Sequence, residues 1–297
     1  MKVEGDLVLA VIGAINVDLV VSGAPLPVAG QTITGGTFAQ HQGGKGGNQA
    51  VAASRMLGRG GRVWMLGAVG DDQLGVAALE ALRRDGVQTD HVLVARDAGT
   101  GVALVAVGPD GENQISVAPG ANEALDPVHV VEALELLEPH VLLASLEVPE
   151  HVVRAALEWS RDHTVATVLN PAPPHRWVHA QIALATYLTP NEHERDALGE
   201  IPSGVVVIET RGAEGAVIDR DGARMYVPAP PVDVVDTTGA GDCFNGVLAA
   251  GLAEGRELID AVRDGVVASA LSVQVAGARD GMPDTYAIGE ARERFGI

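Results

Sequence analysis

From residue 127 onward, segments with helical and strand-like patterns alternate, and this alternation limits the possible folds more than any other feature. The sequence predicts helices over 127–137 and 150–161, and strands over 141–146, 165–169 and 205–209. Strands separated by helices pair in parallel, because the helix carries the chain back to the edge of the sheet where the previous strand began. The alternation therefore predicts an α/β protein with an open, mostly parallel sheet.

Polar residues recur where these strands would end. Glu147 and Asn170 each follow a strand, Asn191 follows a shorter apolar segment, and Thr210 follows the last strand of the series. In an open parallel sheet, ligands bind outside the carboxyl ends of the strands. We therefore expect the functional site at this edge of the sheet.

The N-terminal apolar run from Leu7 to Ile15 predicts a first strand with Asn16 and Asp18 at its end. Residues two positions apart in a strand project to the same face, where an amide and a carboxylate could bind neighbouring sugar hydroxyls. Asn and Asp are also ordinary residues of a strand-end turn. Both interpretations remain open on these residues alone.

Short β segments predict a second, smaller sheet in the N-terminal half. Residues 23–42 are rich in Gly, Pro, Thr and Ala, and the segments 92–94, 102–107 and 114–117 surround a Pro-Asp-Gly turn, which is a hairpin signal. A helix is expected over 48–57. A small sheet outside the main one could serve as a lid.

The segment DTTGAGDCFNG, residues 236–246, combines a glycine-rich turn, two carboxylates and the start of a helix. The apolar residues 232–235 before it predict the end of a strand. Because Gly239, Ala240 and Gly241 have little side chain, their backbone N–H groups and the helix N-terminus can approach an anion closely. Phosphate chemistry is the natural use of such a turn.

Asp242 needs a reason to stand beside an anion site, because a carboxylate repels phosphate. One interpretation is structural, since Asp is favoured as a helix N-cap. The other is catalytic: Asp242 would be a general base that takes a proton from an attacking hydroxyl, while the amides of the turn stabilise charge on the transferred group. The adjacent Cys243, the only cysteine, is either a small packing residue or a thiol activated by the helix N-terminus.

Two familiar nucleotide-binding motifs do not fit. The spacing of Gly239, Gly241 and Gly246 differs from the dinucleotide-binding fingerprint. In the loop 43–48, which reads GGKGGN, Lys45 is followed by Gly rather than by the Ser or Thr of a P-loop.

Composition excludes other classes of protein. A net charge of -19 argues against a nucleic-acid partner, because phosphate backbones are bound by clustered Lys and Arg. The 297 residues, 47% of them hydrophobic, contain no uncharged apolar run long enough to cross a membrane. The start MKVEGDL carries acidic residues where a signal peptide would need basic ones, so a soluble cytoplasmic protein is expected.

With these motifs in place, the sequence resembles the PfkB family of carbohydrate kinases, and within it the members that phosphorylate ribose. The resemblance extends over essentially the whole chain. The segments 43–58 and 236–246 are similar to the two signatures of the family, and four shorter motifs lie between them in the same order: Gly111-Glu112-Asn113, Ser145-Leu146-Glu147, Asn170-Pro171-Ala172-Pro173 and Thr189-Pro190-Asn191-Glu192.

The resemblance implies one doubly wound α/β domain over residues 1–297, with lid segments within 16–42 and 96–118. It implies transfer of the γ-phosphate of ATP to the 5-hydroxyl of D-ribose, with Asp242 as the base and the amides of Gly239, Ala240, Gly241 and Asp242 as the anion hole. The implied sugar-binding residues are Asn16, Asp18, Gly44, Lys45, Gly46, Gly47, Asn48, Glu147 and Asp242. The lid would also form the contact of a homodimer.

The same resemblance implies a nucleotide site and two kinds of cation. The nucleotide would lie near Asn191, Glu194, Thr210, Arg211, Gly212, Gly215, Gly241 and Asp242. Glu194 would help to arrange Mg²⁺ and phosphate. A potassium-like ion would be bound by oxygens of Asp236, Thr238, Ser272, Val275 and Gly277.

Three positions depart from the family pattern. Val266 stands where an Asn near the adenine is usual, Gly281 stands where a Ser contacts the cation, and Arg211 replaces a usual Leu. The alternatives to a ribose kinase are a related kinase for deoxyribose, another sugar or a nucleoside, and a sensor that binds sugar or nucleotide without turnover.

Overall fold

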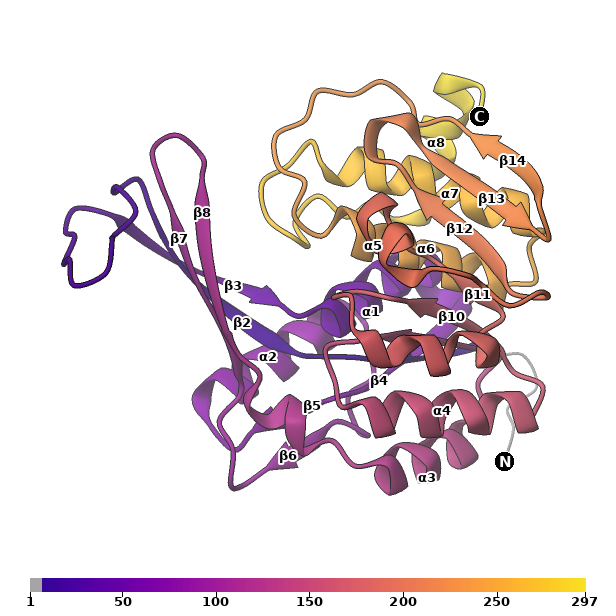
Figure 1. Ribbon diagram of the computed structural model, residues 1–297, viewed down its shortest axis with the longest axis horizontal. Coiled ribbons are helices and arrows are strands. Elements are labelled where there is room, and N and C mark those ends of the chain that lie inside the picture. The colour runs from indigo at the N-terminus through magenta and orange to yellow at the C-terminus, as the bar shows by residue number, and fades with distance from the viewer. Residues whose placement is uncertain (1–6) are drawn as a thin grey trace.

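A computed structural model describes residues 7–297, and its largest element is a mixed sheet that matches the expected α/β architecture (Figure 1). Within these residues the sheet has eight strands in the order β14-β13-β12-β11-β10-β9-β1-β4. The strands from β4 to β12 are parallel, and β13 and β14 are antiparallel to their neighbours. The strands are β1 Leu7–Ile12, β4 Gly61–Leu66, β9 Val141–Ser145, β10 Ala166–Asn170, β11 Tyr187–Leu188, β12 Val206–Thr210, β13 Ala216–Arg220 and β14 Ala223–Val227.

Helices cover both faces of this sheet. The side chains of β1 alternate between two buried clusters: Leu9 and Val11 belong to one, and Ala10 and Ile12 belong to the other. The first cluster contains residues of α1 Lys45–Leu57, α2 Gln73–Arg84, α6 Ala240–Ala253, α7 Leu258–Ser272 and α8 Thr285–Phe295. The second contains residues of α3 Pro127–Leu137, α4 Glu150–Asp162 and α5 Glu192–Leu198. The predicted doubly wound fold is confirmed.

A four-stranded sheet with the order β3-β2-β7-β8 projects away from the rest of the chain (Figure 1). Its strands are β2 Asn16–Ser22, β3 Thr37–Gly43, β7 Gly101–Val107 and β8 Asn113–Ala118. We call it the small sheet. A further pair, β5 Ala68–Gly70 and β6 Leu93–Ala95, lies near its base, and single-turn helices occupy Gly58–Gly60, Gly120–Ala124, Arg176–Ala180, Ile182–Leu184 and Gly212–Glu214.

The predicted end of the first strand was wrong. Strand β1 ends at Ile12, and Asn16 and Asp18 lie in β2 of the small sheet. The apolar run continues through residues 13–15 because this turn is buried beneath the start of α1, where Gly47 N donates to Ala14 O at 3.0 Å.

Residues 232–235 form no strand, and helix α1 begins three residues earlier than expected, at Lys45. The chain at 232–235 runs past the end of α7 instead of beside a strand, and Val235 N donates to Val273 O at 2.8 Å. Among residues 7–297, none of the helices has the length and apolar character needed to cross a bilayer.

Candidate active site

The glycine-rich turn before α6 brings a helix N-terminus and a buried carboxylate together. Gly239 is the N-cap, with a φ of 75°, and a Cβ at this position would lie 2.6 Å from Ala278 O. Only glycine therefore fits the turn. The amides of Gly241 and Asp242, in the first turn of α6, have no acceptor within the helix and can bind an anion.

Asp242 is the third residue of α6, so the N-cap interpretation is wrong. Its side chain is buried and its two oxygens accept from different amides. Asn48 Nδ2 donates to Oδ2 at 2.9 Å, and Gln49 Nε2 donates to Oδ1 at 3.1 Å. Gln49 Nε2 also lies 3.1 Å from Asn170 Oδ1. Two adjacent residues of α1, Asn48 and Gln49, thus hold the carboxylate, and Asn170 of β10 orients the Gln49 amide.

Lys45, the first residue of α1, lies among acidic groups. Its backbone N–H donates to Glu147 Oε2 at 2.8 Å. Burial alone would lower the pKa of Lys45, but the carboxylates of Asp242, Glu147 and Glu194 together outweigh burial and raise it. The ammonium group is therefore charged at neutral pH and partly balances the carboxylates around it.

Four carboxyl groups in this region have a pKa above the ordinary value, and burial is the main cause in each: Asp18, Glu147, Glu194 and Asp242. Lys45 or Arg279 opposes the increase at every one of them. Burial also raises the pKa of the neighbouring Cys243 thiol, to about 12. This cysteine therefore stays protonated and is a packing residue.

The small sheet contributes Asn16 and Asp18 to the same region. Asn16 Oδ1 accepts from Asn122 Nδ2 at 2.8 Å, which fixes the orientation of the Asn16 amide. Gly43 of β3 pairs with Asn16, and Asp18 pairs with His41 on the same face of the sheet; a Cβ at Gly43 would be 2.4 Å from an Asp18 carboxylate oxygen. The absence of a side chain at Gly43 therefore makes room for the carboxylate.

The other glycines of the first signature allow close packing. A Cβ at Gly44 would lie 2.5 Å from Ala14 O, and a Cβ at Gly46 would lie 2.5 Å from the carbonyl carbon of Gly13. Gly47 in turn faces the guanidinium of Arg279. These residues bring the start of α1 against the turn that follows β1.

The expected nucleotide residues gather at the ends of β11 and β12. Asn191 and Glu194 form a capping box at the start of α5, in which Asn191 Oδ1 accepts from Glu194 N and Glu194 Oε2 accepts from Asn191 N, both at 2.8 Å. Thr210 N donates to Pro190 O at 2.9 Å, which joins the two strand ends. The second oxygen of the buried Glu194 carboxylate remains for a cation or for water.

The loop after β12 shows why glycine recurs there. Gly212 has a φ of 51° and Gly215 a φ of 104°, and a Cβ at Gly215 would collide with Val227 O. Arg211, one of the departures from the family pattern, pairs with Glu209 through Nε at 2.8 Å. The Arg211 side chain is therefore held by a residue of β12.

The residues expected to bind a monovalent cation are also brought together. Asp236 Oδ1 accepts from Thr238 N at 2.9 Å, and Oδ2 accepts from Gly277 N at 2.8 Å. Asp236 N donates to Val273 O, next to Ser272. In the described part of the chain no cluster of three or more His, Cys, Asp or Glu could hold a metal. A hard cation here would use the Asp236 carboxylate with backbone carbonyls, and this donor set fits.

Two departures have a structural explanation. A Cβ at Gly281 would lie 2.2 Å from Ser272 O, so a serine does not fit at this position. Val266 is 4% exposed and belongs to the same buried apolar cluster as residues of α1, α6 and α8, where an apolar side chain is expected.

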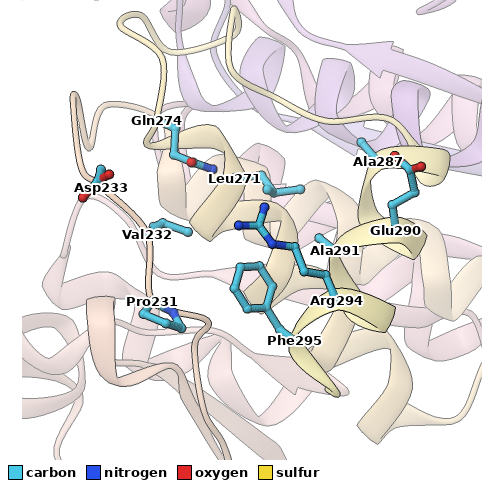
Figure 2. Close-up of a pocket in the computed structure, with 10 residues that line it drawn as sticks. All are labelled: Pro231, Val232, Asp233, Leu271, Gln274, Ala287, Glu290, Ala291, Arg294 and Phe295. Atoms are coloured by element: carbon cyan, nitrogen blue, oxygen red, sulfur yellow. The ribbon is translucent and has the colours of Figure 1, made fainter.

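A groove of about 750 Å³ lies between the segment 231–233, the end of α7 and α8 (Figure 2). The Arg294 guanidinium lies over the Phe295 ring, 5.0 Å from its centroid, and extends toward Leu271. None of the residues expected to bind sugar or nucleotide lines this groove.

Three polar residues of the site were not predicted from the sequence: Gln49, Asn122 and Arg279. The contact of Asn170 with Gln49 was not predicted either. Gln49 gave one usable signal, because it is a second amide in a helix of small and apolar residues. Asn122 and Arg279 carry no local pattern, since the side chains that they orient, Asn16 and Asn48, are more than 100 residues away.

Comparison with known proteins identifies the class. Residues 7–285 match the model of the pfkB family carbohydrate kinases, and the chain belongs to this family. It is 39% identical to a ribokinase of Bacillus subtilis over 286 residues, which cover 93% of this chain and 96% of the relative. It is 31% identical to a deoxyribokinase of Salmonella typhi over 294 residues, which cover 93% and 95%.

A solved structure gives the same result for the fold. The ribokinase of Arabidopsis thaliana, complexed with ribose and ATP, superposes with a TM-score of 0.86 at 26% identity, covering 97% of this chain and 98% of the other.

Proposed function

We propose that this protein is an ATP-dependent ribose kinase, which transfers the γ-phosphoryl group of ATP to the 5-hydroxyl of D-ribose. The observation that carries the proposal is the buried Asp242 carboxylate in the first turn of α6, held by the amides of Asn48 and Gln49. The 39% identity to a ribokinase supports ribose as the acceptor.

In this mechanism Asp242 accepts the proton of the 5-hydroxyl as its oxygen attacks the γ-phosphorus. The new bond joins that oxygen to phosphorus, the bond to the bridging β,γ-oxygen breaks, and ADP leaves. The amides of Gly239, Gly241 and Asp242 stabilise the charge on the transferred group, whereas the amide of Ala240 donates to Thr237 O at 3.2 Å. An ionised Asp242 is required, and Lys45 favours this form because it lowers the pKa that burial raises.

The sugar would lie between the small sheet and α1. The side chains proposed to bind its hydroxyls are Asn16, Asp18, Lys45, Asn48 and Glu147, with Gly44 giving access to the backbone. Gly46 and Gly47 support this site by their lack of side chains. Closure of the small sheet as a lid would exclude water before transfer.

ATP would lie along the ends of β11 and β12, near Asn191, Thr210, Arg211, Gly212 and Gly215. Glu194 would help to hold Mg²⁺, which would neutralise charge on the phosphates. A K⁺ ion bound beside Asp236 would order the turn that carries Gly239. A cytoplasmic location, where ATP is available, is part of the same proposal.

A homodimer through the small sheet is also proposed. Large apolar side chains are exposed on one face of this sheet, as expected for a surface that another molecule covers: Val21, Phe38 and Leu104. Ile115 and Val117 are also exposed, but they pair with Val105 and Ala103 and lie on the same face as Asp18. Leu19 pairs with Leu104 and Val21 pairs with Phe38, so Leu104 and Phe38 lie on the face opposite Asp18.

The second candidate is a kinase of the same family for 2-deoxyribose, favoured by the 31% identity to a deoxyribokinase. A sensor without turnover is less consistent with the buried, oriented Asp242. The test is release of ADP with ribose, 2-deoxyribose, fructose or a nucleoside, each with and without K⁺, using Asp242→Asn as the control. Preference for ribose supports the proposal, preference for another acceptor selects a sister kinase, and ATP turnover absent with all four acceptors supports the sensor.

A further inference from the structure

Arg279 is a buried cation to which the proposed mechanism gives no role. It lies in the segment between α7 and α8 and is 7% exposed. Its Nε donates to Asn48 Oδ1 at 2.8 Å, and its Nη2 donates to Gly43 O at 3.0 Å. Burying a guanidinium is costly, so a position like this one needs a specific reason.

The two partners of Asn48 define the orientation of its amide. A guanidinium can only donate hydrogen bonds, and an ionised carboxylate can only accept them. Arg279 contacts the oxygen of the Asn48 amide and Asp242 contacts its nitrogen. Rotating the amide by 180° would place the Asn48 nitrogen against Arg279 and its oxygen against Asp242, so only the observed orientation satisfies both neighbours.

We infer that Arg279 is a positioning residue of the phosphoryl-transfer site: it holds the Asn48 amide so that Nδ2 is directed at the Asp242 carboxylate. This inference rests on the proposed function, because it assigns Arg279 to the orientation of the proposed base. Arg279 itself touches neither reacting group.

The surroundings of Arg279 are built to hold it in place. A Cβ at Gly47 would lie 2.5 Å from Arg279 Nη2, so the guanidinium fits only because this position in α1 has no side chain. Arg55 Nη1 donates to the carbonyls of Arg279, at 2.7 Å, and Met282, at 2.8 Å. Arg55 also pairs with Asp85 at 2.7 Å, and this ion pair connects the segment that carries Arg279 to the end of α2.

Arg279 also joins the small sheet to the base, because Gly43 is the last residue of β3. The charged groups that act on Asp242 are the cations Lys45 and Arg279 and the carboxylates Asp18, Glu147 and Glu194. Burial lowers the pKa of Arg279 to about 10, so it keeps its charge at neutral pH. The same guanidinium thus contacts the lid strand and orients the amide that holds the base.

The test is a double-mutant cycle on kcat with Arg279→Met, Asn48→Ala and the double variant. If Arg279 acts through Asn48, Arg279→Met lowers kcat by about 10- to 100-fold in the wild-type background and by less than about threefold in the Asn48→Ala background. A loss from general disruption of the fold would be similar in both backgrounds, and that result would overturn the inference.

A second variant and two controls complete the experiment. Gly47→Ala keeps the arginine but displaces its guanidinium, and it should reproduce the loss of kcat with a melting temperature close to that of Arg279→Met. Arg294→Met, in the separate groove, should retain wild-type kcat. If the wild type releases no ADP with ribose, the proposed function itself fails. If Asp242→Asn is as active as the wild type, Asp242 is not the base and the role of Arg279 fails with it. If Asp242→Asn is inactive while Arg279→Met is fully active, only the role of Arg279 is rejected.

Discussion

Asn48 Nδ2 lies 2.9 Å from Asp242 Oδ2, although 194 residues separate them in the chain. Asn48 belongs to α1 and Asp242 to α6, so the contact depends on the distance between these helices. Gly246 in α6 allows the close approach, because a Cβ there would lie 2.4 Å from Gln49 O and 2.7 Å from Ala52 Cβ. The packing of α1 on α6 therefore sets the position of the proposed base.

Replacing Gly246 by Ala should force the two helices apart. We expect a loss of about 1–3 kcal/mol in the free energy of unfolding, because the added methyl meets backbone atoms that cannot move aside. Urea denaturation measures this change. The control is Gly289→Ala in α8, where a Cβ meets nothing within 4 Å and the helix should gain about 0.4–1 kcal/mol. Equal losses at both positions would show that helix packing at Gly246 is not the cause.

Lys45→Met should shift the pH dependence of turnover. Burial raises the pKa of Asp242, and Lys45 is the largest influence that lowers it. Asp242 must be ionised to accept a proton, so activity is lost as the pH falls through this pKa. Removing the charge raises that pKa further, and the acid limb of kcat/KM should move to higher pH. We also expect weaker ribose binding, measured by calorimetry. Lys45→Arg keeps the charge, so the acid limb of its pH profile should stay near the wild-type position. If the acid limb of Lys45→Met does not move, Lys45 does not control the ionisation of Asp242.

The fold was accessible from the sequence because each buried strand is an apolar run of its own. Strands such as Val141–Ser145 and Val206–Thr210 were found within a residue or two of their ends. The end of β1 was missed because the buried turn that follows it is as apolar as the strand. Hydrophobicity reports burial, and burial alone does not distinguish a strand from a turn packed under a helix.

The site was accessible only in part. Asp242 and the glycines of both signatures form short local patterns, whereas Gln49, Asn122 and Arg279 act through partners far along the chain. From the sequence alone, a polar residue in a helix or loop is predicted to lie at the surface, because its buried partner is not known. Local spacing therefore identifies the group that would do the chemistry but not the groups that orient it.

Asp72 should make the stability of the fold sensitive to acid. It caps α2 through Gly75 N at 2.8 Å and accepts from the amide of Thr100, at 2.8 Å, and from its hydroxyl, at 2.7 Å. Burial alone would raise the pKa of Asp72, but these donors together lower it below its ordinary 3.8. Its stabilising contribution is thus present above pH 3.8 and is lost as the pH falls through the lower folded pKa.

Asp72→Asn should accordingly be less stable than the wild type at neutral pH, by about 1 kcal/mol, because the amide nitrogen that replaces Oδ2 cannot accept from Thr100 N. The difference should shrink as the pH falls below about 4. Melting temperatures from pH 2.5 to 7 test this. A constant difference over that range would show that ionisation of Asp72 does not contribute.

The small sheet offers the last prediction. Leu104 and Phe38 are 56% and 62% exposed on the face opposite Asp18, and we propose that a second copy of the chain covers them. The double variant Phe38→Asp and Leu104→Asp should be monomeric in analytical ultracentrifugation at micromolar concentration, because four buried carboxylates per dimer would be costly. Val128→Asp, at an equally exposed position of α3, should leave the dimer intact. A monomeric wild type would reject the dimer, and a dimeric double variant would move the interface to another surface.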